Sequence, residues 1–352
     1  MKIAIADLSN TQNQSKHAVR GSGFYIDNLK AALLKYFPQN YYVFFRQASE
    51  IPQNMDIIHY PYFEPFFLSL PIIKRGKTVV TIHDLTPLVF PKEFPAGIKG
   101  KATWIIQKTN LKTVTAIITD SYTSKEDIQK IVGIEQRKIH VVYLAASEIF
   151  RKIRLSDQDK ITMRKKFDLP KNFLLYVGDA TPNKNLPRML AAVKKAKIPL
   201  VMVGKVFAEQ NIDVNNEWNK DLVYVQKLLQ DEKELIKVVG FVSSDDLVTL
   251  YNLATALLMP SLYEGFGLPV LEAMQCGCPV ITSNDGSLKE ISGKAVYSVD
   301  PYNIEDIERG IRDVFSKKEL QKKLSQKGVE QASRFSWKNT AEKVNEVYKR
   351  VL

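Results

Sequence analysis

The sequence contains few of the residues that stabilise small secreted or zinc-binding domains. Its 352 residues include two cysteines and four histidines. Cys276 and Cys278 cannot build a disulfide framework, and no histidine lies near them to complete the roughly four ligands of a structural zinc site. These absences exclude a disulfide-rich domain and a zinc module, and they indicate a reducing, cytoplasmic compartment.

The sequence also lacks a long apolar run. Its most apolar stretch, residues 60–73, is interrupted by Glu64 and by prolines, and it is shorter than the roughly 20 residues of a membrane-spanning helix. The amino terminus, MKIAIADL, lacks the apolar core and small-residue cleavage site of a secretory signal. We therefore expect neither export nor a transmembrane segment.

The composition is that of a globular protein with excess positive charge. Apolar residues make up 45% and charged residues 25%, and the length allows two domains. Fifty Lys and Arg against 38 Asp and Glu give a formal charge of +12, which favours an anionic partner. Nucleotide diphosphates, an anionic membrane and nucleic acid all fit. Nucleic-acid binding rests on charge alone, so we predict no specific nucleic-acid partner.

Two series of strand-like segments alternate with segments of helical period. The alternation predicts βαβ units, and hence two doubly wound parallel sheets covered by helices, in an α/β protein. A charged stretch at 150–166 separates the series and marks the connection between domains. The strands are expected at 2–6, 42–45, 57–59, 78–82, 116–119 and 140–142, and at 173–177, 200–203, 237–239, 256–259, 280–282 and 295–299.

The segment from Glu264 to Glu272, EGFGLPVLE, follows one of these strands and leads into a helix predicted over 268–276. Gly265 and Gly267 allow a ligand to approach the backbone closely, and amides that open a helix favour phosphate. Because parallel sheets bind ligands beyond the carboxyl ends of their strands, we expect this segment to border a cleft between the domains.

This segment resembles the signature of retaining GT-B glycosyltransferases of family 4, in which two glutamates are separated by seven residues. The resemblance implies that Glu264 contacts the transferred sugar and that Glu272 holds the ribose of the nucleotide donor. The backbone amides of Phe266, Gly267 and Leu268 would then meet the diphosphate and the sugar. It also implies the GT-B fold, two Rossmann-like domains that face each other across a cleft.

A second motif, YVGDATPNKN at 176–185, resembles the family's strand, glycine turn and phosphate-binding lysine. The resemblance implies that Gly178 forms the turn and that Lys184 stabilises the charge of the departing diphosphate. Asp179 stands where many relatives carry an arginine, and the sequence does not indicate what replaces it. Lys205, which follows the next strand, is one candidate.

Motifs in the amino-terminal half resemble parts of the same family. The segment GSGFY at 21–25 is similar to a glycine turn that faces the donor phosphates, which implies a contact for Gly23. His83, in TIHDLTP, matches a histidine beside the donor sugar, while Asp84 is expected to fix the turn.

Motifs further along the chain extend the resemblance. Val242, in GFVSSDD, would offer backbone contacts to the nucleotide base. RFSWK at 334–338 matches the family's tail, which crosses back to the first domain. The expected division is therefore an acceptor-side domain at 1–153, a donor-binding domain at 154–335 and a returning helix at 336–352.

The resemblance implies retaining transfer of a hexose from a nucleotide diphosphate sugar to a glycan or a lipid-linked saccharide. GDP-mannose is favoured over a UDP-sugar. No metal is expected, because Asp157-Gln-Asp159 follows Ser156 in the charged linker and is typical of an acidic first helical turn. Catalysis would rest on placement of the substrates and on charge stabilisation by Lys184 and His83.

Other functions fit the same motifs. A catalytically idle nucleotide-sugar-binding subunit would lack transfer, and an epimerase or phosphorylase of this fold would give different products. The aromatic segment 60–67 could line an acceptor groove or, with Lys74, Arg75 and Lys77, touch an anionic membrane at its inner face.

Overall fold

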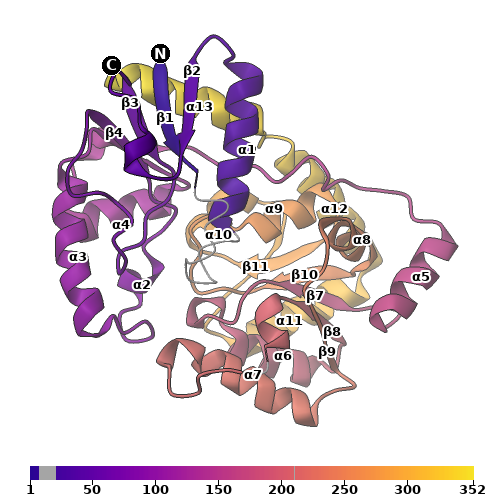
Figure 1. Ribbon diagram of the computed structural model, residues 1–352. Helices are drawn as coiled ribbons and strands as arrows, with labels where there is room; N and C mark the ends of the chain where they lie inside the picture. Colours follow the sequence, from indigo (N-terminus) through magenta and orange to yellow (C-terminus); the bar gives the residue numbers. More distant parts are fainter. Residues whose placement is uncertain (8–20, 210) are drawn as a thin grey trace. The chain divides into compact units, whose positions relative to one another are not determined.

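The computed structural model describes residues 1–7, 21–209 and 211–352 (Figure 1). The chain divides into two compact units. The first unit comprises Met1–Ala145 and Phe335–Leu352, and the second comprises Ala146–Arg334. Each unit has its own sheet and is described by itself.

The sheet of the first unit consists of parallel strands in the order β2-β1-β3-β4-β5-β6. Ile3 of β1 pairs with Tyr42 on one side and with Ile57 on the other, so the strand order reverses at β1. The strands are β1 (Lys2–Ala6), β2 (Tyr41–Phe45), β3 (Ile57–Tyr60), β4 (Lys77–Thr81), β5 (Ala116–Thr119) and β6 (Ile139–Val141).

Helices cover this sheet, and the last helix of the chain is one of them. The Tyr348 hydroxyl lies 2.7 Å from His59 Nδ1, and Asn40 Nδ2 donates to Asn345 Oδ1 at 3.0 Å. Figure 1 shows this helix, in yellow, near α1. The helices are α1 (Gly21–Tyr36), α2 (Thr86–Val89), α3 (Gly97–Lys112), α4 (Tyr122–Val132) and α13 (Trp337–Val351).

The sheet of the second unit is also parallel, with the order β12-β11-β10-β7-β8-β9. Its order reverses at β7, which pairs with β8 on one side and β10 on the other. The strands are β7 (Leu174–Val177), β8 (Leu200–Val203), β9 (Ile236–Gly240), β10 (Ala256–Met259), β11 (Val280–Ser283) and β12 (Tyr297–Val299).

Amphipathic helices enclose the core of the second unit. Apolar residues three and four apart, such as Met189 and Val193 of α6 and Ile307 and Ile311 of α11, are fully buried against strands that are buried on both faces. The helices are α5 (Asp157–Phe167), α6 (Leu186–Ala196), α7 (Lys220–Asp231), α8 (Ser244–Leu253), α9 (Leu268–Gln275), α10 (Gly286–Ser292), α11 (Ile304–Ser316) and α12 (Lys318–Ala332).

The predicted fold class, two doubly wound parallel sheets, is confirmed, and the strand ends differ by one or two residues. The strand expected from 295 begins at Tyr297, because the Ala295 N–H donates to the Ser292 carbonyl and so closes the end of α10. None of the described helices is both long and apolar enough to cross a membrane.

The connection between the units differs from the boundary expected after residue 153. The second unit begins at Ala146 and ends at Arg334. The Ile153 N–H donates to Asn252 Oδ1, and Asn252 Nδ2 donates to the Arg151 carbonyl. The ring of Phe150 lies edge-on to that of Tyr251. These contacts attach residues 150–153 to α8. The order of strands and the distribution of charge along the sequence do not reveal this attachment.

Candidate active site

Lys184 and Glu264 form an ion pair at the point where the strand order of the second unit reverses. Lys184 follows β7 and Glu264 follows β10, and these two strands are neighbours. Lys184 Nζ lies 2.8 Å from Glu264 Oε1 and 2.7 Å from Oε2. The exposed fractions of the two side chains are 17% and 9%. Ligands of doubly wound sheets bind at such reversal points, so the motifs meet where a site is expected.

Hydrogen bonds fasten the two loops that carry this pair. Asn183 Nδ2 donates to the Tyr263 carbonyl at 3.0 Å, and the Leu262 N–H donates to the Asn183 carbonyl at 2.8 Å. The hydroxyl of Ser287, in the first turn of α10, donates to the Glu264 carbonyl at 2.6 Å. The backbone on both sides of the ion pair is therefore fixed before any ligand binds.

Gly267 ends the loop and precedes the first turn of α9. It adopts φ of 107°, and a Cβ at this position would lie 2.6 Å from Leu288 Cδ2. Only glycine suits both the backbone angle and the space. Pro269 lies in the first helical turn, where its missing N–H costs no hydrogen bond. Phe266 is buried and Leu268 is half-buried. The backbone of Phe266, Gly267 and Leu268 leads directly into α9, which begins at Leu268.

Glu272 lies on α9 and accepts a hydrogen bond from Tyr251 of α8. The Tyr251 hydroxyl lies 2.9 Å from Glu272 Oε2. Burial raises the pKa of Glu272 to about 7, although the hydrogen bond from Tyr251 acts in the opposite direction. The carboxyl group is therefore partly protonated at neutral pH. Oxygen atoms of this kind can accept hydrogen bonds from a diol when ionised.

The loops after β7, β8 and β9 approach one another closely. A Cβ on Gly204 would lie 2.2 Å from the Gly178 carbonyl oxygen, so only glycine permits this approach. The carbonyl of Asp179, at the position of the expected arginine, accepts a hydrogen bond from the Tyr176 hydroxyl at 2.6 Å. Lys205 is exposed at the end of β8. Val242 is buried after β9.

In the first unit, His83 follows β4 and pairs with Asp120, which follows the neighbouring strand β5. His83 Nδ1 lies 2.7 Å from Asp120 Oδ2, and the side chains are 20% and 3% exposed. Burial lowers the pKa of His83, whereas the charge and the hydrogen bond of Asp120 raise it, as do Asp84 and the Pro61 carbonyl. Together these raising effects outweigh burial, so the pKa of His83 is raised. The ring is also packed edge-on against Tyr25, 4.8 Å between centroids.

Two atoms of this pair lack hydrogen-bond partners among the described residues, His83 Nε2 and Asp120 Oδ1, and both are buried. Gly23 lies in the first turn of α1, with no described atom within 4 Å of the position that a Cβ would occupy. The polar loop before that helix falls on residues 8–20, outside the described residues.

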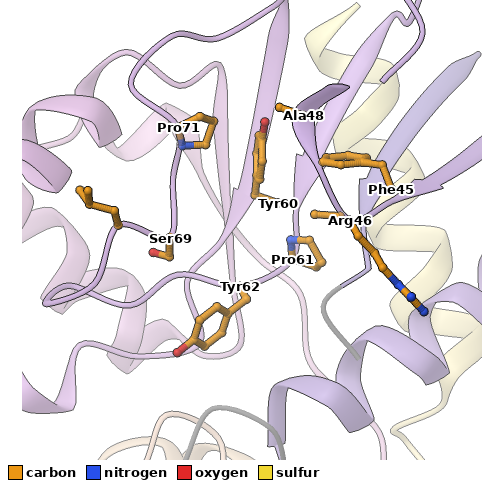
Figure 2. A pocket seen from close by; sticks show the side chains of 10 residues that line it. Phe45, Arg46, Ala48, Tyr60, Pro61, Tyr62, Ser69 and Pro71 are labelled. Atoms are coloured by element: carbon orange, nitrogen blue, oxygen red, sulfur yellow. The ribbon is translucent and has the colours of Figure 1, made fainter. Parts of the chain in front are cut away.

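A pocket of about 260 Å³ opens at the carboxyl ends of β1, β2 and β3. These strands flank the reversal point of the first sheet. Figure 2 shows Phe45 and Arg46 at the end of β2, and Tyr60, Pro61 and Tyr62 at the end of β3. The remaining lining residues are Ala6, Ala48, Leu68, Ser69 and Pro71. Aromatic, basic and hydroxyl-bearing residues thus line the same pocket.

Two family models match the chain. The model described as "Glycosyl transferases group 1" matches residues 157–331, and the model "Glycosyltransferase Family 4" matches residues 11–146. The chain belongs to the family 4 glycosyltransferases. The predicted family and enzyme class are thus confirmed.

Named relatives of this glycosyltransferase include the serotype-specific mannosyltransferase WbdA of Escherichia coli, 28% identical over 282 residues. The match covers 78% of this chain and 34% of WbdA, so the chain spans about a third of that protein. O-antigen chain mannosyltransferase B of E. coli is 28% identical over 313 residues, 86% of this chain and 77% of that protein.

A solved structure with the same fold is HepE of Anabaena in complex with UDP and glucose. It superposes with a TM-score of 0.72 at 16% identity and covers 98% of both chains. Likeness at this identity shows the fold, and the GT-B prediction is confirmed.

The DxD sequence of this glycosyltransferase belongs to the first turn of α5. Ser156 and Asp159 form a reciprocal capping box, and Asp157 pairs with Lys160 at 2.8 Å. The prediction of an acidic helix start is confirmed. Over the described residues no three His, Cys, Asp or Glu side chains gather as metal ligands would.

Three residues of the site were not predicted from the sequence, namely Asp120, Tyr251 and Tyr25. Asp120 could have been found, because it follows a strand as His83 does. Tyr251 and Tyr25 lie within helices, and the sequence of a helix does not indicate which residue of another element its tyrosine contacts. The fold brings Tyr251 of α8 to Glu272 and Tyr25 of α1 to His83.

Proposed function

We propose that this glycosyltransferase transfers a hexose, with retention of anomeric configuration and without a metal, from a nucleotide diphosphate sugar to a glycan or a lipid-linked saccharide. The observation that carries the proposal is the Lys184 and Glu264 pair at the reversal point of the second sheet, eight residues before Glu272 in the sequence. In this proposal Lys184 supplies a cation for phosphate, and Glu264 and Glu272 supply carboxylates for hydroxyl groups.

The donor would bind to the second unit through these groups. Lys184 would exchange its contact with Glu264 for the diphosphate, which frees Glu264 to accept hydrogen bonds from the transferred sugar. Glu272 would hold the ribose diol, and Gly178 and the amides of Phe266, Gly267 and Leu268 would meet the diphosphate. Val242 would contact the base.

The first unit would contribute to the donor sugar and to the acceptor. The family resemblance assigns Gly23 to the donor phosphates and His83 to the donor sugar. Asp120 would hold the His83 ring and favour the tautomer with hydrogen on Nδ1. The pocket at the ends of β1, β2 and β3 has the aromatic and polar walls that suit a saccharide, and we assign the acceptor to it.

Mannose is the proposed sugar, with GDP-mannose as the donor, because the relatives WbdA and mannosyltransferase B carry mannosyltransferase names. A UDP-sugar is second, since the HepE structure holds UDP. The departing diphosphate would accept the acceptor proton on the same face of the sugar, so no protein base is needed. We place the reaction in the cytoplasm, at the inner face of the membrane when the acceptor is lipid-linked.

Thermal-shift measurements with nucleotide sugars test the donor. A ligand that binds only the native state raises Tm, and we expect GDP-mannose to do so equally with and without a chelator. Transfer to an acceptor, with the anomeric configuration of the product read by NMR, then tests the reaction. Donor binding without hydrolysis or transfer would instead indicate an idle binding subunit, and a chelator-sensitive shift would contradict metal independence.

A further inference from the structure

Helix α3 buries Leu111 against the core, but it also exposes three isoleucines and buries two polar side chains. Its buried face includes Gln107 and Asn110, whereas Ile98, Ile105 and Ile106 are exposed to fractions of 90%, 68% and 41%. A helix that covers a sheet normally buries its large aliphatic residues. Packing against the core of this unit therefore does not explain why Ile98, Ile105 and Ile106 lie on the exposed side of α3.

The loop before β4 is fastened alongside this helix and adds further exposed apolar side chains. Gln107 Nε2 donates to the Phe67 carbonyl at 2.6 Å and to Ser69 Oγ at 2.9 Å. Lys74 Nζ donates to Thr113 Oγ1 just beyond the end of α3, at 2.8 Å. The loop carries exposed Phe67, Leu68, Ile72 and Ile73.

The polar residues interleaved with these apolar ones are nearly all basic. Residues 65–113 contain eight Lys and Arg, against Asp84 and Glu93 as the acidic residues. Asp84 accepts a hydrogen bond from the Thr86 N–H, and Glu93 lies before α3. Lys99, Lys101 and Lys112 are exposed on α3, and none of the three forms an ion pair with a described residue.

We propose that this surface docks on an anionic lipid bilayer. The α3 face, defined by Phe67, Leu68, Ile72, Ile73, Ile98, Ile105, Ile106, Lys74, Arg75, Lys99, Lys101 and Lys112, inserts its apolar side chains among the lipid headgroups while its lysines meet anionic headgroups. Long lysine stems suit this arrangement because their methylene groups can lie along apolar surface. A second copy of the chain is disfavoured, since a symmetric interface would oppose these lysines to one another.

The aromatic segment expected to touch the membrane takes little part in this surface. Tyr60, Pro61 and Tyr62 line the pocket, and Phe63 is buried. Lys77 donates to the Leu352 carbonyl. Phe67 is exposed and, with Lys74 and Arg75, remains part of the proposed surface. The choice of a lipid-linked acceptor rests on the proposed function, whereas docking itself does not.

Sedimentation of the full chain with vesicles tests the proposal. Binding is compared for vesicles of phosphatidylcholine alone and vesicles that also contain phosphatidylglycerol, at low and moderate salt. We expect binding to the anionic vesicles, and the double variant K99E/K101E should weaken it by about tenfold or more. The variant I98S/I105S should also weaken it, because the apolar contact is lost while the charge is kept.

Matched controls separate this face from the net charge of the chain. K323E/K327E changes the charge equally on the exposed side of α12, and I161S removes an exposed isoleucine from α5. Both should bind vesicles as the unchanged chain does, and all variants should keep its Tm. Failure of the unchanged chain to bind anionic vesicles, or equal loss in K323E/K327E, overturns the proposal.

The donor-induced rise in Tm is measured on the same variants. A chain that binds vesicles but responds to no nucleotide sugar would contradict the proposed function and support lipid docking. A chain that responds to the donor but ignores vesicles would do the reverse, and would leave the α3 face to an acidic protein partner.

Discussion

Lys184 and Glu264 form an ion pair in which both side chains are largely buried. Removing either side chain would leave the other without this ion pair. We expect Lys184→Ala to lower kcat by about two orders of magnitude, more than it lowers donor affinity, because the lysine would stabilise charge that grows as the diphosphate departs. The free energy of unfolding should also fall, by about 3 kcal/mol, since the Glu264 carboxylate loses its ion pair. Single-turnover kinetics and denaturant unfolding measure the two effects.

Two further variants sharpen this result. The double variant K184A/E264A should lose less stability than the sum of the single changes, because neither partner is then left alone. Lys205→Ala removes an exposed lysine at the end of the next strand and should change little. If Lys205→Ala lowers kcat as much as Lys184→Ala does, then Lys205 takes the place of the missing arginine at Asp179.

Burial raises the pKa of Glu272 to about 7, and this would make donor binding pH-dependent if Glu272 holds the ribose as proposed. The carboxylate accepts hydrogen bonds from a diol better than the acid does, so the Kd for a nucleotide diphosphate sugar, whose phosphates do not titrate in this range, should decrease as pH rises through about 7. Tyr251→Phe removes the hydrogen bond that lowers this pKa and should shift the midpoint upward. Calorimetric titration between pH 6 and 9 measures the midpoint.

The control for this prediction is Tyr297→Phe, which removes a hydroxyl that donates to Asp313 Oδ2 at 2.9 Å. It should leave the midpoint unchanged. Glu272→Gln should weaken binding and remove the dependence on pH in this range. A midpoint that persists in Glu272→Gln would show that another group is responsible.

At the scale of elements, the sequence predicted regular strands well and unusual helices poorly. Strands such as β5 and β10 are short, apolar and buried on both faces, so a run of apolar residues is enough to predict them. The carboxyl end of a strand then located the segment that begins at Glu264, and the family resemblance added Lys184 and His83. No helix was predicted over α3, whose exposed Ile98, Ile105 and Ile106 and buried Gln107 and Asn110 depart from the usual helical pattern.

Asp120 could have been found at the end of its strand, but which side chains on different elements pair with each other could not be predicted. Asp120 meets His83 because β4 and β5 are neighbours, and Tyr251 meets Glu272 because α8 lies beside α9. Neither adjacency is encoded by spacing along the chain. Family motifs assign residues to a ligand, whereas the groups that set their pKa values and orientations come from the tertiary arrangement.

At the scale of the molecule, the two ends of the chain are joined in one unit. His59 of β3 lies between Tyr348 of α13 and Thr81 of β4, with ring nitrogens 2.7 Å and 2.8 Å from their hydroxyls. Burial lowers the pKa of His59 to about 3, and the neighbouring charge of His83 acts in the same direction. His59 is therefore neutral in the folded protein at every pH near neutrality.

The unfolded chain binds a proton at His59 below about pH 6.5, whereas the folded first unit resists it down to about pH 3. Stability from this group is present above pH 6.5 and is lost as pH falls toward 3, by about 1.4 kcal/mol per pH unit in that window. Glu64 opposes the trend, because burial raises its pKa to about 7. Comparison with His59→Gln, which keeps hydrogen bonds to Tyr348 and Thr81 available, isolates the histidine.

Hydrogen exchange followed by mass spectrometry, corrected for the intrinsic rate at each pH, reports on the units separately. Between pH 7 and pH 5, β1, β3 and α13 should lose more protection in the unchanged chain than in His59→Gln. Strands β7 and β10 of the second unit should respond alike in both proteins. An equal response of the first unit in both would mean that His59 accepts its proton without disturbing α13.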